Sequence, residues 1–414
     1  MRRRVVVTGM GGVTALGDAF AALEPALREG WGAVRRMPEW DRYVDLQTRL
    51  GAPVDSFTTL PHLPRKVLRS MGRVALLGLR SAELALEDAG LLGAPELQDG
   101  RTGIAYGSSS GSLEPLLALG ASAAEGRFQG LGATSYIQLM SHTAAVNIGL
   151  TFGLRGRVLP TCSACTSSSQ ALGYACEAIR YGHQDVMLAG GSDELTFFSA
   201  AVFDSLYATS QRNDQPETTP RPFDRDRDGL VVGEGGVTLV LEERERALAR
   251  GARIHAELLG FGTNSDGAHV TSPQRDTMAA VMALALADAG LPSQDIAWVN
   301  AHGTATEAGD IAESLATWDT FQRPVPLSSL KGHFGHTLGA CGALEAWLGI
   351  ETLARGWVPP TLHLDHPDPR CADLDYVMRV PRPVGGDTFM TNNFAFGGIN
   401  TSLILRVEPR GRRS

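Results

Sequence analysis

The sequence predicts an α/β fold built from two similar halves. Buried apolar strands alternate with helices along the chain, and polar turns join them. The stretch 158–180 runs from a short strand through a turn into a helix rich in small residues, and 326–347 repeats this order. A charged run at 244–251 ends in glycine and separates the repeats. We therefore expect an N-terminal half at 1–250 and a C-terminal half at 251–414, with the two small-residue helices packed closely together.

The remaining elements follow from hydrophobic periodicity. Apolar runs bounded by glycine predict strands, and apolar residues at three- and four-residue spacing predict helices. In the first half we expect strands at 4–9, 102–107, 185–191 and 233–243, and helices at 18–30 and 71–90. In the second half we expect strands at 252–262, 297–303 and 401–407.

Composition restricts the class of protein. Hydrophobic residues make up 43% of the chain, enough for a large core, and a formal net charge of −8 argues against nucleic-acid binding. An acidic partner would therefore need a local basic patch. Five cysteines, an odd and sparse set, fit a reducing compartment. The chain shows neither a signal peptide nor a run of roughly 20 apolar residues, so a soluble cytoplasmic protein without a membrane span is expected.

Cys165 lies where the strand that begins at Val158 turns into a helix. A thiol there faces unpaired backbone N–H groups and the positive end of the helix dipole, which favour the thiolate. Cys165 is thus a candidate nucleophile, although a small cysteine beside Ala and Ser is also a common core residue. Cys162 and Cys165 together fit the C-x-x-C pattern of a redox pair or half a zinc site. Since the chain has no second such pair, no metal site is expected.

Three other motifs suggest rival functions. Gly9-Met-Gly11-Gly12 is an incomplete dinucleotide fingerprint, for which a glycine turn after a strand is the simpler interpretation. Gly107-Ser-Ser109-Ser-Gly111 matches a nucleophile elbow and makes Ser109 the candidate nucleophile of a serine hydrolase. Asp224, Asp226 and Asp228 mimic the start of a calcium loop. Because Gly235 stands where such a loop needs a glutamate, we expect a surface or buried ion-pair loop of Asp and Arg instead.

Polar residues of the second half complete a coherent catalytic set with Cys165. His302, Lys331 and His336 follow predicted strands, at the ends where α/β sheets place ligand sites. Two imidazole N–H groups can hold a carbonyl whose oxygen becomes negative. Such a site suits decarboxylation of a 3-carboxy thioester to an enolate, which then attacks an acyl group on Cys165. The backbone N–H groups of Cys165 and Phe396 can form an oxyanion hole.

Over essentially its whole length the chain resembles the elongating β-ketoacyl-acyl carrier protein (ACP) synthases of the thiolase-like superfamily. The pair Lys331 and His336 places it with the Cys-His-His branch rather than with the Cys-His-Asn initiating enzymes. The motifs that carry the resemblance are Ser163-Ala-Cys165-Thr-Ser, Arg221-Pro-Phe-Asp-Arg-Asp-Arg-Asp-Gly, Asn300-Ala-His302-Gly-Thr-Ala-Thr306, Lys331-x4-His336 and Asn393-Phe-Ala-Phe396-Gly-Gly-x-Asn400.

The resemblance implies a thiolase-like, five-layer αβαβα fold of two duplicated halves, in a homodimer or in a heterodimer with a chain-length-factor-like subunit. It implies no bound cofactor, because phosphopantetheine is carried by the partner ACP. The activity implied is a decarboxylative Claisen condensation of malonyl-ACP with an acyl chain, in fatty-acid synthesis or in type II polyketide or polyene synthesis. A ketosynthase active only with a chain-length-factor partner is the alternative.

The resemblance also assigns roles to individual residues. Cys165 would accept the acyl chain from ACP, and His302 and His336 would bind the malonyl thioester and support its decarboxylation. Lys331 would order the site electrostatically with Glu345 as its partner. The substrate-binding residues implied are Thr304 and Thr306 for the phosphopantetheine arm, Phe396 as the gate, and the loop Ser108, Ser109 and Ser110 for the acyl pocket.

The chain departs from the family pattern in three places, and the serine loop and the Gly332-His333-Phe334 stretch bear on the substrate. Cys162 replaces a small non-thiol residue, and Gly332-His333-Phe334 is an unusual filling between Lys331 and His336. Ser108-Ser-Ser110 replaces the more usual glycine or aliphatic residue of the pocket loop. A serine-rich wall suits an unsaturated, oxygenated or aryl-bearing chain better than a saturated one.

Overall fold

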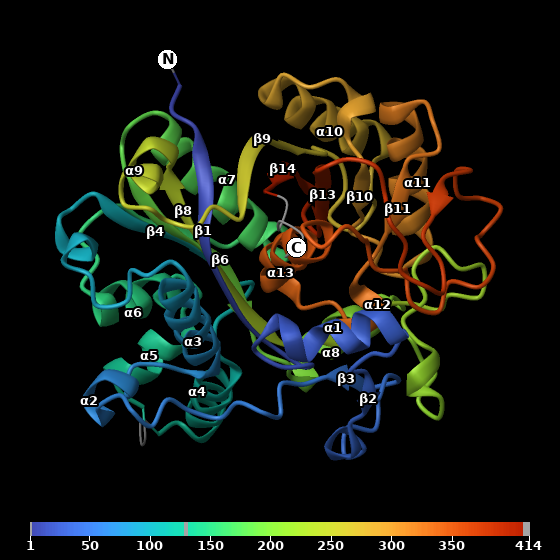
Figure 1. The fold of residues 1–414 in the computed structure, drawn as a ribbon. Helices are drawn as coiled ribbons and strands as arrows, with labels where there is room; N and C mark the ends of the chain where they lie inside the picture. Colours follow the sequence, from blue (N-terminus) through green and yellow to red (C-terminus); the bar gives the residue numbers. More distant parts are fainter. Residues whose placement is uncertain (1, 128–130, 409–414) are drawn as a thin grey trace.

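The two halves have the same strand topology in a computed structural model that describes residues 2–127 and 131–408 (Figure 1). In each half, four neighbouring strand pairs follow the order antiparallel, antiparallel, parallel, parallel. The first sheet has the order β1 (Val5–Thr14), β8 (Gly235–Glu243), β6 (Val186–Asp193), β4 (Thr102–Gly107), β5 (Val158–Thr161). The second has the order β9 (Ala256–Ser265), β14 (Ile399–Val407), β13 (Thr388–Ala395), β10 (Trp298–Asn300), β11 (Pro326–Ser328), with β12 (Asp375–Tyr376) at its edge.

Antiparallel pairing of β1 with β9 joins the sheets at Val6–Glu257 and Val7–Ala256. Helices form the other three layers, as Figure 1 shows. Outside the first sheet lie α3 (Arg73–Asp88) and α6 (Thr143–Phe152), and outside the second lie α10 (Arg275–Ala289) and α11 (Glu307–Phe321). Between the sheets lie α7 (Ser167–Arg180) and α13 (Cys341–Leu353). This arrangement is the predicted αβαβα fold.

The central helices approach closely because their facing residues are small. A Cβ added at Gly342 in α13 would lie 2.7 Å from the Cβ of Ser169 in α7. The Ser168 hydroxyl accepts a hydrogen bond from the Ala343 N–H at 3.0 Å. The predicted packing of the two small-residue helices is therefore confirmed, and it brings the starts of both helices to one place.

The glycines at 9–12 allow a helix to pack closely against the first strand. We predicted a turn at Gly9–Gly12, and this prediction is wrong because β1 continues to Thr14 and pairs with β8 along this stretch. A Cβ at Gly9 would lie 2.7 Å from the Cβ of Ala89, the residue that follows the end of α3. In the other half, a Cβ at Gly260 would lie 2.8 Å from the Cβ of Ala289 in α10. The dinucleotide-like pattern is thus a helix-on-strand contact that both halves repeat.

The remaining elements surround these five layers. Strands β2 (Arg35–Arg36), β3 (Leu50–Ala52) and β7 (Val232–Gly233) form a small separate sheet. The other helices are α1 (Phe20–Glu29), α2 (Arg65–Leu68), α4 (Leu113–Glu125), α5 (Ala133–Leu139), α8 (Phe197–Asp204), α9 (Arg244–Ala249) and α12 (Lys331–Phe334). The division at residue 250 falls between α9 and β9 and stays a prediction. None of the described helices combines the length and the hydropathy that a bilayer crossing requires.

We expect Gly9→Ala to lower the free energy of unfolding by about 1–3 kcal/mol, because its methyl group would enter the filled contact with α3. The matched control is Gly120→Ala in α4, where an added Cβ has no neighbour within 4 Å. This control should raise the same free energy by up to about 1 kcal/mol through helix propensity. Urea unfolding of both variants checks the pair, and equal effects would contradict the packing role of Gly9.

Candidate active site

Cys165 lies in a strained turn that directs its side chain toward His336. It belongs to a short 3-10 turn, Ala164–Thr166, between β5 and α7, and its side chain is buried. The preceding residue, Ala164, has a φ of 49°, in the left-handed region that costs a non-glycine residue energy. The equivalent turn of the other half places Leu338 at a φ of 50°. Both halves therefore carry the same strained turn, and one of them holds the thiol.

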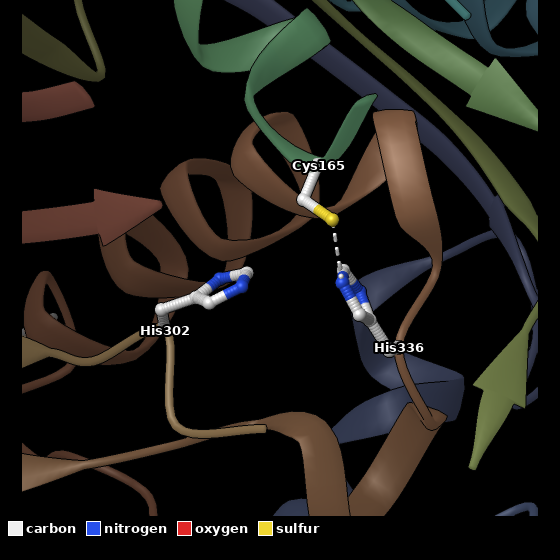
Figure 2. A group of neighbouring side chains, drawn as sticks. All are labelled: Cys165, His302 and His336. Carbon is white, nitrogen blue, oxygen red and sulfur yellow. Dashed lines mark hydrogen bonds between the residues drawn. The ribbon is translucent and has the colours of Figure 1, made fainter. Parts of the chain in front are cut away.

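Figure 2 shows two imidazoles that face this thiol, His302 from the loop after β10 and His336 from the loop after α12. The His336 Nε2 lies 3.0 Å from the Cys165 Sγ. The two imidazole rings are nearly perpendicular, with centroids 5.2 Å apart. The structure thus brings together three residues that are up to 171 positions apart in the chain.

Hydrogen bonds at the back of each ring select its tautomer. The His336 Nδ1 accepts the Leu338 N–H at 3.2 Å. The His302 Nδ1 lies 3.3 Å from the Nζ of Lys331, which can only donate. With Nδ1 as the acceptor, each neutral ring carries its proton on Nε2. Burial, followed by the charge of Lys331, holds the pKa of both histidines well below the usual value, so both rings are neutral N–H donors.

A buried polar network holds Lys331 behind the histidines. Its Nζ lies 2.6 Å from the Glu345 Oε1, and the Asn393 amide donates to the Glu345 Oε2 at 2.6 Å. Burial alone would lower the pKa of Lys331, but Glu345 raises it above its usual value and keeps the ammonium charged. The predicted partnership of Lys331 with Glu345 is present, and Asn393 joins it without having been assigned a role from the sequence.

Glu313 was also missed, although it lies eleven residues beyond His302. Its carboxyl accepts the backbone N–H groups of His302 and Gly303 at 2.8 and 2.7 Å. Burial raises the pKa of Glu313 to about 8. The carboxyl therefore fixes the loop that carries His302. The signal available in the sequence was a glutamate in the helix that directly follows the His302 motif.

Burial reverses the ionisation expected for Cys165. We predicted a thiolate at the helix start, but desolvation raises the pKa of the thiol to about 11. Lys331 and the backbone N–H groups of Phe396 and Cys165 act in the opposite direction. The resting group is a thiol, and these N–H groups are the pair predicted to form an oxyanion hole.

Two cavities meet at the thiol. The first, here called the arm channel, runs past His302, His336, Thr304 and Thr306 to the surface. The second, here called the acyl pocket, is lined by residues of α4, α5 and α8. Cys165, Phe203 and Phe396 line both. The Phe396 ring packs on Phe203 with centroids 5.1 Å apart, so Phe396 stands between the cavities, where the family resemblance places a gate.

The threonine loop and the aspartate loop support the arm channel. The hydroxyls of Thr304 and Thr306 lie 2.9 Å apart and both residues line the channel. Asp310 accepts the Thr304 N–H at 3.0 Å and pairs with the buried Arg227 at 3.5 Å. Arg227 also pairs with Asp368 at 2.7 Å. The calcium-like stretch is therefore the expected ion-pair loop of Asp and Arg, buried at Asp224 and Arg227 and exposed at Asp226.

The serine loop divides between two tasks. Ser109 and Ser110 line the acyl pocket as predicted. Ser108 does not, because its buried hydroxyl donates to Asp193 at 2.8 Å. The hydrogen bonds that Ser109 forms to Asp193 and Cys162 include no histidine within the described chain, so the geometry of a serine hydrolase is absent there.

The other two departures lie away from the substrate cavities. Cys162 is exposed and its thiol contacts the Ser109 carbonyl at 3.4 Å. All five cysteines are free thiols, so Cys162 and Cys165 form no disulfide here. His333 points toward the N-terminal segment, where its Nδ1 lies 2.9 Å from the Trp31 carbonyl oxygen. We expected the Gly332-His333-Phe334 filling to affect the substrate, but His333 packs against a structural segment instead.

The site also has the spacing of a three-ligand metal site, since one atom each of Cys165, His302 and His336 lie within 4.8 Å of one another. Its chemistry opposes a cation. A metal at Nε2 would require the proton on Nδ1, where Leu338 N–H and Lys331 Nζ already donate. The neighbouring Lys331 ammonium adds repulsion. We derive no step through a metal.

A thiol nucleophile opposite two neutral imidazole donors, on a duplicated αβαβα fold, defines a condensing acyltransferase of the thiolase-like class. Comparison with known proteins agrees. The beta-ketoacyl synthase N-terminal domain matches residues 2–247 and the C-terminal domain matches residues 255–365. The chain belongs to the beta-ketoacyl synthase family, whose members form a carbon–carbon bond by condensation.

Individual relatives match over nearly full length. The 3-oxoacyl-[acyl-carrier-protein] synthase 2 of Vibrio cholerae is 37% identical, over 98% of this chain and 99% of the relative. A crystal structure of a beta-ketoacyl synthase from Burkholderia phymatum STM815 is 58% identical with a TM-score of 0.97, over 98% of this chain and 100% of that one. The ishigamide ketosynthase/chain length factor is 32% identical with a TM-score of 0.91, over 99% and 100%.

We expect alkylation of Cys165 by iodoacetamide to accelerate about tenfold per pH unit between pH 7 and 10. The reactive thiolate is a small fraction of a thiol with a pKa of about 11, and this fraction grows tenfold per unit below the pKa. Mass spectrometry of the Cys165 peptide in a Cys162→Ser background checks the rate. A rate that levels off below pH 8 would show that the helix dipole and Lys331 outweigh burial.

Proposed function

We propose that this enzyme is a β-ketoacyl-ACP synthase that carries its acyl chain on Cys165 and extends it with malonyl-ACP. The observation that carries the proposal is the position of the thiol, at the junction of the arm channel and the acyl pocket and opposite two imidazole donors. A substrate arm can enter by one cavity and leave its acyl chain in the other.

Acylation exchanges one thioester for another. The Cys165 sulfur attacks the acyl-ACP carbonyl, and the carbonyl oxygen becomes negative beside the N–H groups of Cys165 and Phe396. The bond to the phosphopantetheine sulfur then breaks, and holo-ACP leaves with the proton that Cys165 has lost. Because the resting thiol is protonated, proton loss belongs to this step rather than to the free enzyme.

Condensation uses the two histidines. The Nε2–H groups of His302 and His336 hold the thioester oxygen of malonyl-ACP as the bond to its carboxylate breaks and carbon dioxide leaves. The α-carbon of the enolate attacks the acyl carbonyl on Cys165, and the thiolate departs and regains a proton. Burial and then the charge of Lys331 keep both rings neutral, and Lys331 and the Leu338 N–H orient His302 and His336, so their N–H groups need no rearrangement as charge develops.

We expect acyl-ACP to leave an acyl adduct on Cys165, seen by mass spectrometry of its peptide. Cys165→Ala should form no adduct and still decarboxylate malonyl-ACP, because the histidines hold the enolate without the thiol. His336→Ala should lower decarboxylation by about 10²–10³-fold, the usual effect of removing one oxyanion donor. An adduct on another residue, or decarboxylation that His336→Ala leaves unchanged, would refute the proposal.

Exposed cations on α2 offer a docking site for the acidic carrier. Arg65, Lys66 and Arg69 are exposed, and none of them forms an ion pair with a carboxylate in the described chain. On a chain with a net charge of −8, this cluster is the local basic patch that an acidic ACP requires.

We expect reversing all three α2 charges to glutamate to raise the KM for acyl-ACP at least tenfold at low salt, since steering and pairing with the carrier are lost. The kcat/KM for an acyl-pantetheine thioester, which lacks the protein carrier, is the control and should stay unchanged. Steady-state kinetics with both substrates checks this. An equal loss with both would indicate damage to the fold rather than lost docking.

A second subunit fits the face beside the acyl pocket. Strand β5 is a sheet edge that pairs only with β4 among the described strands, and Val158 on it is 43% exposed. The apolar α4, whose Leu116 lines the acyl pocket, exposes Leu116, Leu117 and Leu119. We infer a two-subunit assembly across this face, either a homodimer or a heterodimer with a chain-length-factor-like partner.

Native mass spectrometry of the purified protein should show a dimer, which Leu117→Glu combined with Val158→Lys should convert to monomer. Each substitution would bury a charge in an apolar interface, which costs free energy and therefore favours the monomer. A dimer that survives this pair would place the interface elsewhere, and a monomer in the unmodified protein would favour the heterodimer. The pathway served, fatty-acid or polyketide, and the cytoplasmic location stay predictions.

A further inference from the structure

The acyl pocket contains a carboxyl group that the condensation does not use. Its wall is mainly apolar, formed by residues such as Leu113, Leu139, Phe198 and Val202. Glu194, at the end of β6, lines the same pocket. Apart from Cys165 it is the one ionisable side chain among the described residues that line it. An acidic group is costly in a pocket meant for a saturated hydrocarbon.

One oxygen of this carboxyl has a structural partner. The Glu194 Oε1 accepts the Leu113 N–H at 2.6 Å, which ties it to the first residue of α4. The described residues form no second hydrogen bond to the carboxyl. Burial, with smaller contributions from Glu234 and Asp193, raises the pKa of Glu194 to about 7. At neutral pH the group is therefore able both to accept and to donate a hydrogen bond.

Most other polar groups of the pocket are occupied by the protein. Thr196 and Ser199 cap α8 together, with the Ser199 N–H donating to the Thr196 Oγ1 at 3.0 Å. The Ser112 hydroxyl accepts the Val74 N–H at 3.2 Å. The Ser109 hydroxyl is buried and faces the Asp193 carboxyl, whose pKa it lowers. Glu194, in contrast, keeps one carboxyl oxygen without a partner among the described residues, and this oxygen can meet a bound chain.

We propose that Glu194 makes the acyl pocket selective for acyl chains that carry a hydroxyl group. The proposal rests on the function proposed above, since the chain must first be loaded on Cys165. A substrate hydroxyl satisfies buried groups that a methylene leaves unpaired, and sites built to bond a hydroxyl discriminate strongly against its absence. An apolar pocket alone discriminates far less.

The competing explanation is that Glu194 only caps α4. The two roles separate by substitution. Glu194→Gln keeps an oxygen for the Leu113 N–H and a polar group for the substrate, whereas Glu194→Leu removes both. Thr196→Val is the matched control, because it removes a helix-capping hydroxyl from the same pocket that is already engaged with Ser199.

The experiment measures condensation of malonyl-ACP with two acyl-ACPs, 8-hydroxyoctanoyl-ACP and nonanoyl-ACP, whose chains match in length because the hydroxyl of one takes the place of the last methyl group of the other. The readout is the ratio of their kcat/KM values, which a change in the folded fraction does not move. We expect the unmodified enzyme and Glu194→Gln to favour the hydroxylated chain. Glu194→Leu should lower the ratio at least tenfold, and Thr196→Val should leave it unchanged.

Each outcome has one meaning. A ratio that favours the saturated chain in the unmodified enzyme overturns the selectivity, and so does a ratio that Glu194→Leu leaves unchanged. An equal fall with Thr196→Val would make Glu194 a structural cap. If neither carrier acylates Cys165, the proposed function itself fails, and this result differs from efficient loading of both chains without preference.

Discussion

Close contact between the two central helices is the constraint on which the site depends. Gly342 leaves room for Ser169, and a hydrogen bond from Ala343 to Ser168 fixes the register of α13 against α7. Each helix begins at a strained turn, so the contact brings both turns together. The nucleophile comes from the first half and both imidazoles come from the second. Neither half holds all three side chains alone, so the site forms only when the two halves pack together.

Electrostatics at the site works through one buried cation. The Lys331 ammonium is held by Glu345 and Asn393, and its charge depresses the pKa of both histidines in addition to burial. Lys331 at the Nδ1 of His302 and the Leu338 N–H at the Nδ1 of His336 leave both Nε2–H groups directed at the substrate. A neutral donor pair suits an enolate, because it stabilises negative charge without giving up a proton. The buried ion pair thus contributes orientation and charge state, as a preorganised site requires.

The two cavities that meet at Cys165 receive different parts of the proposed substrate. The arm channel is the cavity that we propose for the phosphopantetheine arm, and it is lined by Thr304 and Thr306, whose hydroxyls lie 2.9 Å apart. The acyl pocket meets the part of the substrate that differs between pathways. Its apolar wall is interrupted by Glu194, and we propose that this residue sets the substrate preference. Phe396 lies between them and can separate loading from condensation.

The chain alone predicted the strand–turn–helix repeats and singled out Cys165, the two histidines and the Lys331–Glu345 pair, because hydrophobic period and short motifs are local properties. The structure brings these side chains together. The sequence prediction was wrong at Gly9–Gly12, where contact with α3 rather than a turn explains the glycines. The tertiary structure decided the ionisation of the buried side chains and the directions in which they point. A short motif does not show burial, and burial keeps Cys165 protonated as a thiol. The fold also directs the Ser108 hydroxyl to Asp193 and places Glu194 in the wall of the acyl pocket. Ionisation and direction are set by neighbours distant in sequence, so only the folded chain could assign them.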